Sequence, residues 1–214
     1  QLKRLLRYVK GTEDMSTVFE IRDNNDRRGQ TVKRLEVYTD SDWASDQTTR
    51  KSTRCAVIMA EGMRLHAHSR GQASVALSSC EAEVMAASEG VKEALLLQEV
   101  LMFIGLGHSE IEIKVDSSAA HAFFRRRGVG RMKHIDSSIL WLQDLTAAGG
   151  VRLKKIPRTQ NLADMLTHTP SAKELEVFLP LMSLRSCSER DKELMETKQY
   201  KPVPVGNAKV YLHG

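Results

Sequence analysis

Short apolar runs near the start of the chain predict three β-strands, at residues 34–40, 55–60 and 63–69. Each run has the length of a strand, and polar or turn-forming residues separate it from the next. Glu61-Gly62 stands between the second and third runs, and a glycine in so short a connection favours a tight turn. The pattern therefore predicts strands that are joined by a hairpin.

A long stretch at helical spacing follows these strands. Ser78, with Glu81 three residues later, is a capping-box pattern that favours a helix start, and Gly105 predicts its end after about Phe103. The apolar positions that keep this spacing are Val84, Ala87, Val91, Leu95 and Met102. We therefore expect one long helix after the hairpin.

The second half of the chain alternates between strand and helix patterns. The predicted elements are a strand at 111–116, a helix at 117–125, a helix at about 135–147, a strand at 151–156 and a short helix near 160–167. The complete order is βββ-α-β-α-α-β-α. This order predicts an α/β domain in which helices flank a mixed sheet of five strands.

Three segments outside this pattern have a simpler character. Residues 1–10 predict a short amphipathic helix that Gly11 ends, and residues 21–33 predict a polar connector. Residues 185–214 contain two prolines and no sustained periodicity, so we expect a weakly ordered tail.

Charge is unevenly distributed along the chain. The 214 residues carry a formal net charge of +5 and are 41% hydrophobic, which is enough apolar content for a packed core. Residues 117–163 hold nine Lys or Arg side chains against two acids. A basic segment of this kind is usually a solvated surface, but beside a cluster of carboxylates it favours a nucleic-acid partner.

Cysteine content and hydropathy restrict the setting. The three cysteines, Cys55, Cys80 and Cys187, form an odd number without paired spacing, so we expect reduced thiols and an intracellular protein. No apolar run has the roughly 18 residues that a membrane span needs, and we expect no membrane partner. The compartment inside the cell is left open.

Four carboxylates stand at the positions where such a sheet presents side chains along one edge. Asp40 and Asp116 end strand patterns, Glu83 lies in the first turns of the long helix, and Asp164 follows the last strand. Carboxylates that are brought together raise one another's pKa unless a cation neutralises them, and hard divalent metals prefer oxygen ligands. Two such metals are a known device for phosphodiester chemistry.

Taken singly, these acids have simpler interpretations. Asp40 suits a turn, Glu83 suits a helix surface, and Asp116 suits a helix N-cap. His66 and His68 alternate on one predicted strand and hint at zinc, but no other Cys or His pair in the sequence completes a site, so we interpret them as half-exposed strand residues.

Five motifs in order resemble one known family. They are Tyr38-Thr-Asp-Ser-Asp-Trp-Ala44, Val75-Ala-Leu-Ser-Ser-Cys-Glu-Ala-Glu83, Val115-Asp-Ser-Ser-Ala119, Lys133-His-Ile-Asp136 and Asn161-Leu-Ala-Asp164. Residues 34–170 resemble the ribonuclease H domain of copia-type (Pseudoviridae) retrotransposon polyproteins. Residues 1–33 resemble the end of the preceding reverse-transcriptase region with a connector, and residues 171–214 are expected to form a C-terminal helix and the weakly ordered tail.

The resemblance implies a ribonuclease H-like fold and a metal-dependent endonuclease that cuts the RNA strand of RNA/DNA hybrids during reverse transcription. The family's four catalytic, metal-binding acids fall on Asp40, Glu83, Asp116 and Asp164. Glu83 fits the catalytic helix better than Glu81, which we expect to serve the helix N-terminus. The expected cofactor is a pair of Mg²⁺ ions, for which Mn²⁺ can substitute.

The expected partners are the RNA/DNA hybrid and the reverse-transcriptase domain of the same polyprotein, with no small-molecule substrate. The side chains expected to grip the nucleic acid are Arg125, Arg126, Arg127, Arg131, Lys133, His134 and Lys154. Several residues depart from the family pattern, among them Arg54-Cys55-Ala56 in place of Ser-Gly-Tyr and Ser117 after the second Asp, but they leave the four acids intact.

Two other functions compete with this hypothesis. A transposase or integrase of the same architecture places a catalytic Glu about 35 residues after the second Asp, and no Glu occurs between Asp116 and Glu174. The second alternative is a catalytically silent domain of a decayed retroelement that binds nucleic acid or tethers the polymerase. The retention of all four acids favours activity.

Overall fold

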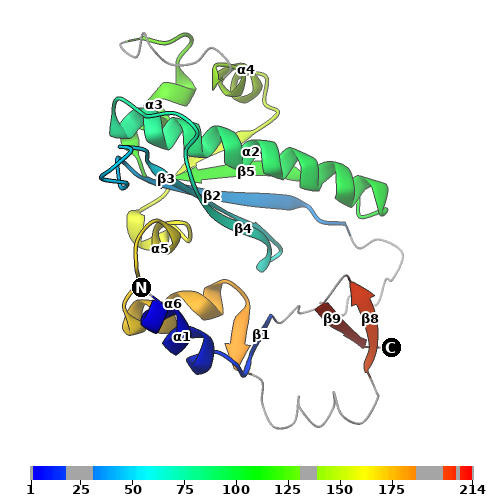
Figure 1. Ribbon diagram of the computed structural model, residues 1–214. Coiled ribbons are helices and arrows are strands. Elements are labelled where there is room, and N and C mark those ends of the chain that lie inside the picture. Colours follow the sequence, from blue (N-terminus) through cyan, green and yellow to red (C-terminus); the bar gives the residue numbers. More distant parts are fainter. Residues whose placement is uncertain (1, 18–30, 131–138, 187–199, 206–207, 214) are drawn as a thin grey trace. The chain divides into compact units, whose positions relative to one another are not determined.

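The computed structural model describes residues 2–17, 31–130, 139–186, 200–205 and 208–213. The chain divides into two compact units, one of residues 19–183 and one of residues 1–18 with 184–214 (Figure 1). Among the described residues, no helix is long and apolar enough to cross a membrane.

The larger unit is built on a five-stranded sheet, which confirms the predicted mixed sheet (Figure 1). Its strands lie in the order β4-β3-β2-β5-β6; β2, β3 and β4 are antiparallel, whereas β5 runs parallel to both β2 and β6. The strands are β2 (Arg34–Asp42), β3 (Thr53–Ala60), β4 (Met63–Gly71), β5 (Glu110–Val115) and β6 (Arg152–Lys155).

The helices of this unit follow the predicted order. They are α2 (Ser79–Phe103), α3 (Ser118–Arg125), α4 (Trp141–Ala147), α5 (Asp164–Thr167) and α6 (Ala172–Leu181). The helix predicted from residue 135 is described only from Trp141, because residues 131–138 lie outside the described part. The single short helix predicted near 160–167 is instead a 3-10 turn at Arg158–Gln160 followed by α5.

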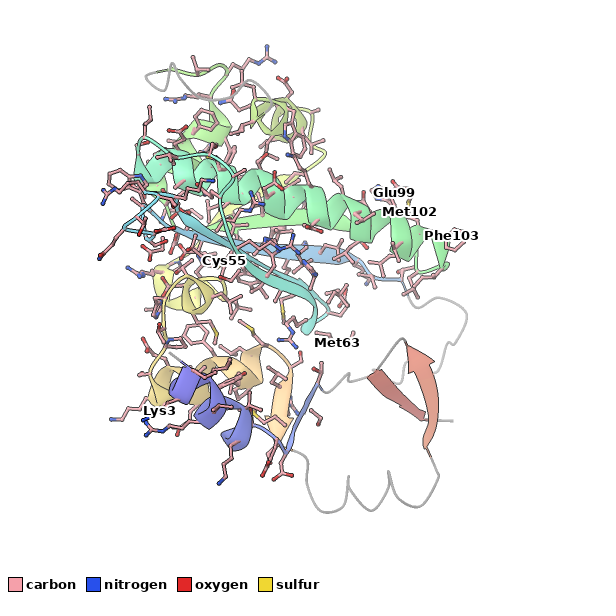
Figure 2. All side chains as sticks on the ribbon, in the orientation of Figure 1. Lys3, Cys55, Met63, Glu99, Met102 and Phe103 are labelled. Carbon is pink, nitrogen blue, oxygen red and sulfur yellow. The ribbon has the colours of Figure 1, made fainter. Side chains whose placement is uncertain are left out.

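The helix α2 lies against the sheet at a position without a side chain. A Cβ at Gly90 would stand 2.7 Å from Thr39 Cγ2 and 3.1 Å from Val37 Cγ1, so any larger residue would push α2 away from β2. The far end of this helix is different, since Phe103 is 91% exposed there (Figure 2). The close contact between α2 and β2 therefore lies in the N-terminal half of the helix, which also carries Glu83.

Two apolar clusters stabilise the larger unit. One joins α2, α3 and α4 to the sheet through residues such as Val37, Val84, Val91, Ile113 and Leu142. The other lies between β3 and the segment from Leu162 to Met182, with Val57, Met165 and Phe178 in contact. Because α6 contributes to this second cluster, it packs with the larger unit, while the predicted boundaries at residues 33 and 170 stay predictions.

The smaller unit contains regular structure where the sequence pattern predicts a weakly ordered tail. The predicted N-terminal helix is present as α1 (Leu2–Gly11), and β1 (Met15–Thr17) pairs antiparallel with β7 (Leu184–Ser186). A hairpin of β8 (Tyr200–Val205) and β9 (Ala208–His213) follows. The β1–β7 pairing is invisible in the local pattern, because each strand is three residues long and its partner lies far away in the sequence.

Candidate metal centre

Three of the four predicted acids meet at the end of the sheet where β2 and β5 finish. Asp40 lies near the end of β2, Glu83 lies in the second turn of α2, and Asp116 follows the last residue of β5. One carboxylate oxygen from each lies within 4.8 Å of the other two. The structure therefore brings together three acids that come from three separate elements.

Strand register explains why Asp40 and Asp116 meet. The parallel pairing of β2 with β5 sets Tyr38 opposite Lys114, and two further residues along each strand lead to Asp40 and Asp116. Parallel strands end at the same edge of a sheet, so both side chains are presented at that edge. A run that ends in Asp on each of two parallel strands is sufficient to produce this pair.

The start of α2 fixes the position of Glu83. The Ser78 side chain accepts a hydrogen bond from the Glu81 backbone N–H, and Glu81 Oε2 in turn accepts one from the Leu77 backbone N–H at 2.8 Å. Glu81 therefore serves the helix N-terminus as predicted. Glu83, two residues later, is left to face the other acids.

Burial and mutual repulsion raise the pKa values of Glu83 and Asp40. Removal from water is the largest cause of a Glu83 pKa of about 8, and the charges of Asp40 and Asp116 add to it, while Ser41 partly opposes them. The pKa of Asp40 is also raised, first by burial, although a hydrogen bond from Thr167 opposes the shift. Glu83 and Asp40 therefore hold their protons more tightly than isolated carboxyls do, and a bound cation would offset the free energy of ionising them.

One atom of the cluster shows how a cation would fit. Glu83 Oε2 is buried and has no hydrogen-bond partner among the described residues. A buried carboxylate oxygen without a partner is costly, and a divalent cation is the kind of ligand that satisfies it. The residues present therefore suit a hard metal ion bound by oxygen.

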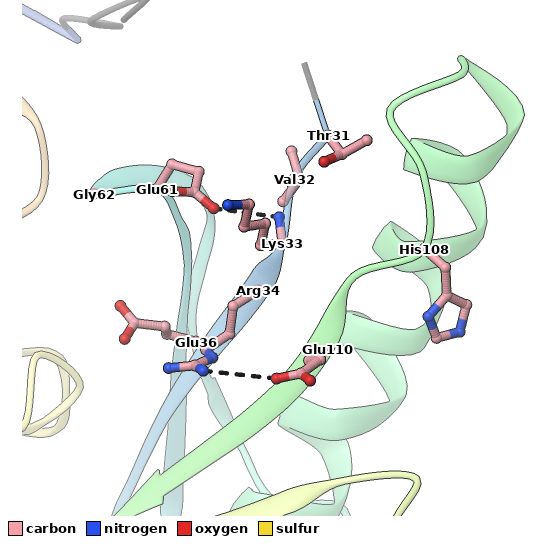
Figure 3. Close-up of a pocket in the computed structure, with 9 residues that line it drawn as sticks. All are labelled: Thr31, Val32, Lys33, Arg34, Glu36, Glu61, Gly62, His108 and Glu110. Atoms are coloured by element: carbon pink, nitrogen blue, oxygen red, sulfur yellow. Dashed lines mark hydrogen bonds and ion pairs between the residues drawn. The ribbon is translucent and has the colours of Figure 1, made fainter. Parts of the chain in front are cut away.

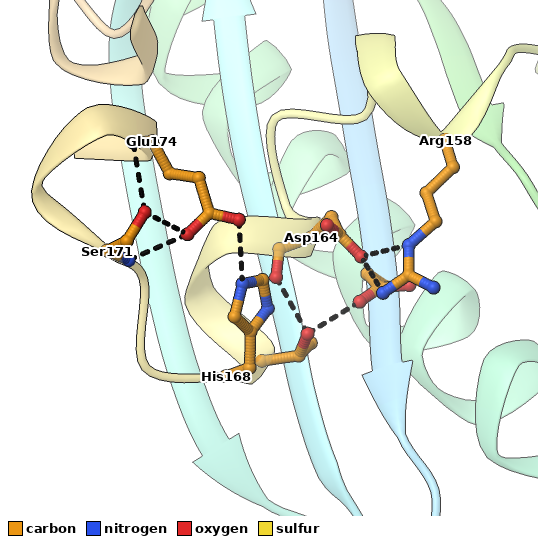
Figure 4. A network of polar contacts seen from close by, with 7 residues as sticks. Arg158, Asp164, His168, Ser171 and Glu174 are labelled. Carbon is orange, nitrogen blue, oxygen red and sulfur yellow. Dashed lines mark hydrogen bonds and ion pairs between the residues drawn. The ribbon is translucent and has the colours of Figure 1, made fainter. Parts of the chain in front are cut away.

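Asp164, the fourth predicted acid, is held apart from the other three. Its Oδ1 accepts a hydrogen bond from Arg158 Nε at 2.8 Å and lies 2.8 Å from a second guanidinium nitrogen (Figure 4). Its charge still reaches the cluster, because it contributes to the raised pKa of Asp40. Among the described residues, only Asp40, Glu83 and Asp116 form the converging set of acids.

Two polar residues that are not among the predicted site residues connect Asp164 to β2. The buried Asn161 side chain donates to the Thr39 carbonyl oxygen at 3.0 Å. Thr167 Oγ1 lies 2.8 Å from both Asp40 Oδ2 and the Asp164 carbonyl oxygen. Asn161 belongs to a recognisable motif, whereas nothing in the local sequence marks Thr167.

The predicted nucleic-acid residues are only partly described. Arg125, Arg127 and Lys154 are exposed. Arg126 instead contacts its neighbours in the sequence: it donates a hydrogen bond to the Val129 carbonyl oxygen at 2.9 Å and lies over the Phe123 ring. The remaining predicted residues, Arg131, Lys133 and His134, lie outside the described part of the chain.

A pocket of about 840 Å³ lies at the opposite ends of the same strands (Figure 3). It is lined by residues at the start of β2, by Glu110 at the start of β5 and by the Glu61-Gly62 turn. Because Asp40 and Asp116 are at the other ends of β2 and β5, this pocket is separate from the acid cluster.

Three features define a ribonuclease H-like α/β fold: the strand order of the sheet, the long helix α2 packed against it, and the acids at the ends of the strands. The Pol polyprotein of transposon TNT 1-94 from Nicotiana tabacum is 31% identical over 186 residues, which are 86% of this chain and 13% of the relative. The Pol polyprotein of transposon RE2 from Arabidopsis thaliana is 27% identical over 168 residues, covering 78% of this chain and 11% of that protein. The chain is therefore homologous to a segment of the Pol polyproteins of copia-type transposons, and the predicted resemblance is confirmed.

Other similarities are shorter or more distant. The secreted RxLR effector protein 161 of Plasmopara viticola is 40% identical over 96 residues, covering 45% of this chain and 62% of that protein. Among solved structures, LC11-RNase H1 from compost has a TM-score of 0.48 at 18% identity, with 67% of this chain and 99% of that chain covered. The N-terminal RNase H domain of rv2228c from Mycobacterium tuberculosis has a TM-score of 0.43 at 18% identity, with coverages of 63% and 91%. No protein-family model matches the chain.

Proposed function

We propose that this chain carries a metal-dependent ribonuclease H that hydrolyses the RNA strand of RNA/DNA hybrids during reverse transcription of a retrotransposon. The observation that carries the proposal is the convergence of Asp40, Glu83 and Asp116 within 4.8 Å. Homology to transposon Pol polyproteins supports the same function. The chain spans only about an eighth of the length of the TNT 1-94 polyprotein, so the rest of such a polyprotein is not part of it. That a reverse-transcriptase domain of the same polyprotein is its partner is therefore also part of this proposal.

The proposed ligands of a pair of Mg²⁺ ions are Asp40, Glu83 and Asp116, with Asp164 at the margin of the site. Bound divalent ions would supply a nucleophilic water and stabilise the departing oxygen of the scissile phosphodiester. The chain's own residues hold the ligands in place. Glu83 must lose its proton to bind a cation, and the raised pKa makes this step dependent on pH.

The hydrogen bonds around Asp40 and Asp164 orient the site. Thr167 restricts the Asp40 carboxylate, and Asn161 ties the segment before Asp164 to the strand residue that precedes Asp40. The Arg158 guanidinium occupies an oxygen of Asp164, so the fourth acid must release or share this partner before it can contact a cation. These residues act through the carboxylates and are positioning residues.

The exposed arginines at the end of α3 are suitably placed to grip a phosphate backbone. The helix α3 begins two residues after Asp116 and has eight residues, so it spans about 12 Å. Arg125 and Arg127 therefore lie within roughly one helix length of the proposed metal site. Contacts of this kind position a nucleic acid, and the 2′-hydroxyl groups distinguish RNA from DNA.

The test is cleavage of a labelled RNA/DNA hybrid by the full chain in Mg²⁺ or Mn²⁺, compared with Asp116→Asn. We expect metal-dependent cutting of the RNA strand that the substitution abolishes. The matched control is Asp144→Asn on α4, which removes an exposed acid outside the cluster and should leave cutting intact. Hybrid binding without any cutting by the unsubstituted chain would favour the silent binding domain instead.

A further inference from the structure

A second group of metal-binding side chains lies on the sheet, apart from the acid cluster. His66 and His68 of β4 and Glu93 of α2 each place one ligand atom within 4.8 Å of the other two. All three side chains are partly buried. The local sequence pattern does not mark a third ligand for the histidines, because Glu93 lies 25 residues after His68 on a different element.

Strand register explains why the three side chains converge. His66 pairs with Ile58 and His68 pairs with Ala56 of β3. Ile58 packs in the apolar cluster beneath α2, and Ala56 faces the α2 backbone at Gly90. Both imidazoles therefore stand on the face of the sheet that α2 covers. Glu93 follows Gly90 by about one turn of this helix, which places it near them.

The separation of the two imidazoles matches the edge of a metal site. His68 Nδ1 lies 3.3 Å from His66 Nε2. A tetrahedral ion with bonds of about 2.0–2.1 Å to nitrogen holds two such atoms about 3.3–3.4 Å apart. One carboxylate oxygen of Glu93 already lies within 4.8 Å of a ring nitrogen of each histidine, so a small change of its side-chain rotamer would complete the set.

The chemistry of the ligands selects the ion. Imidazole nitrogen with carboxylate oxygen suits Zn²⁺ and related transition metals, whereas Mg²⁺ prefers oxygen alone. The charged groups around His68 are Arg54, Arg70, Glu89 and Glu93, so both signs are present. The strand β4 is at the edge of the sheet, which leaves the half-exposed imidazoles open to an ion from solution.

We propose that His66, His68 and Glu93 form a binding site for a divalent transition-metal ion of the Zn²⁺ class, separate from the acid cluster. Three protein ligands leave one coordination position for water. The bound ion would join the edge strand β4 to the middle of α2, the helix that carries Glu83 near its N-terminus. The simpler alternative is a hydrogen bond between two neutral imidazoles, which accounts for the 3.3 Å distance but gives Glu93 no part.

The test measures Zn²⁺ binding to the full chain with the acid cluster removed by Asp40→Asn and Asp116→Asn. Calorimetry should show one Zn²⁺ per chain, and the visible spectrum of bound Co²⁺ should show a tetrahedral site. In that background, His66→Gln, His68→Gln and Glu93→Gln should each weaken binding by more than about tenfold, because losing even an outer-shell partner costs that much. The control His108→Gln removes an exposed histidine two residues before β5 and should leave the Zn²⁺ affinity unchanged.

A second measurement separates the metal site from effects on folding. Zn²⁺ should raise the midpoint of thermal unfolding of the chain that carries Asp40→Asn and Asp116→Asn, and of its His108→Gln derivative. It should not raise the midpoint of the three ligand variants in the same background, whose circular dichroism should remain native. Zn²⁺ affinity that is the same in all variants would overturn the proposal. Retention of binding in Glu93→Gln alone would also overturn it as a three-ligand site.

Discussion

Arg158 holds Asp164 through two guanidinium nitrogens, each 2.8 Å from the same carboxylate oxygen. Arg158 lies in the 3-10 turn after β6, and Asp164 is the first residue of α5 (Figure 4). The guanidinium is mostly exposed, so it can leave Asp164 at little cost. We therefore expect Asp164 to contact a bound cation only when Arg158 moves away from it.

Replacing Arg158 with Gln should free Asp164. We expect the Mg²⁺ concentration for half-maximal binding to fall severalfold, because a positive charge leaves the neighbourhood of the acids. The free energy of unfolding should change by less than about 1 kcal/mol, as is usual for an exposed ion pair. The control is Arg152→Gln at the start of β6, which breaks an exposed ion pair with Glu110 of β5. Weaker Mg²⁺ binding in Arg158→Gln would contradict this role.

The raised pKa of Glu83 predicts a pH dependence of stability without metal. The native carboxyl has a pKa of about 8 against 4.5 for the ordinary group, so the native state binds more protons than the unfolded chain between these values. The free energy of unfolding should therefore fall as pH rises through this window, by at most about 1.4 kcal/mol per pH unit. Denaturant unfolding at a series of pH values measures the slope.

Two comparisons check that Glu83 causes this slope. Glu83→Gln should flatten the dependence and abolish cleavage, since the amide carries no proton to lose and is a poor metal ligand. Mg²⁺ should bind the unsubstituted chain more tightly as pH rises towards 8, because binding requires the ionised carboxylate. An unchanged slope in Glu83→Gln would assign the titration to another group.

Gly90→Ala tests the close approach of α2 to β2. The added Cβ would stand 2.7 Å from Thr39 Cγ2, inside contact distance, in a buried part of the sheet. We expect a loss of about 1–3 kcal/mol in the free energy of unfolding and weaker metal binding, because α2 carries Glu83. The control Gly71→Ala at the end of β4 has no atom within 4 Å of the new Cβ and should be nearly neutral.

Asn161→Ala tests the link between β2 and the segment before Asp164. It removes the buried donor to the Thr39 carbonyl oxygen and should cost about 1–3 kcal/mol in the free energy of unfolding. Cleavage should fall because Asp164 and Thr167 lose their alignment with Asp40. Gln160→Ala, an exposed neighbour, should leave both properties unchanged. Normal cleavage by Asn161→Ala would show that this hydrogen bond does not position the site.

Local pattern determined the elements of the larger unit. Hydrophobic periodicity and turn residues are local properties, so β2 to β6 and α2 fall within a few residues of their predicted bounds. The same signals placed Asp40 and Asp116 at strand ends and assigned Glu81 to the helix N-terminus. Where pattern is absent, as in the three-residue strands β1 and β7, the sequence alone predicts nothing.

Only the tertiary structure decided which side chains meet. The contacts of Thr167 with Asp40 and of Glu93 with His66 and His68 join residues on different elements, and their geometry depends on strand register and on the depth at which Gly90 lets α2 settle. The separation of Asp164 from the other acids likewise depends on a guanidinium six residues away across a turn. The chain's own residue order determined the fold and the acids, while packing decided their distances, their pKa values and their partners.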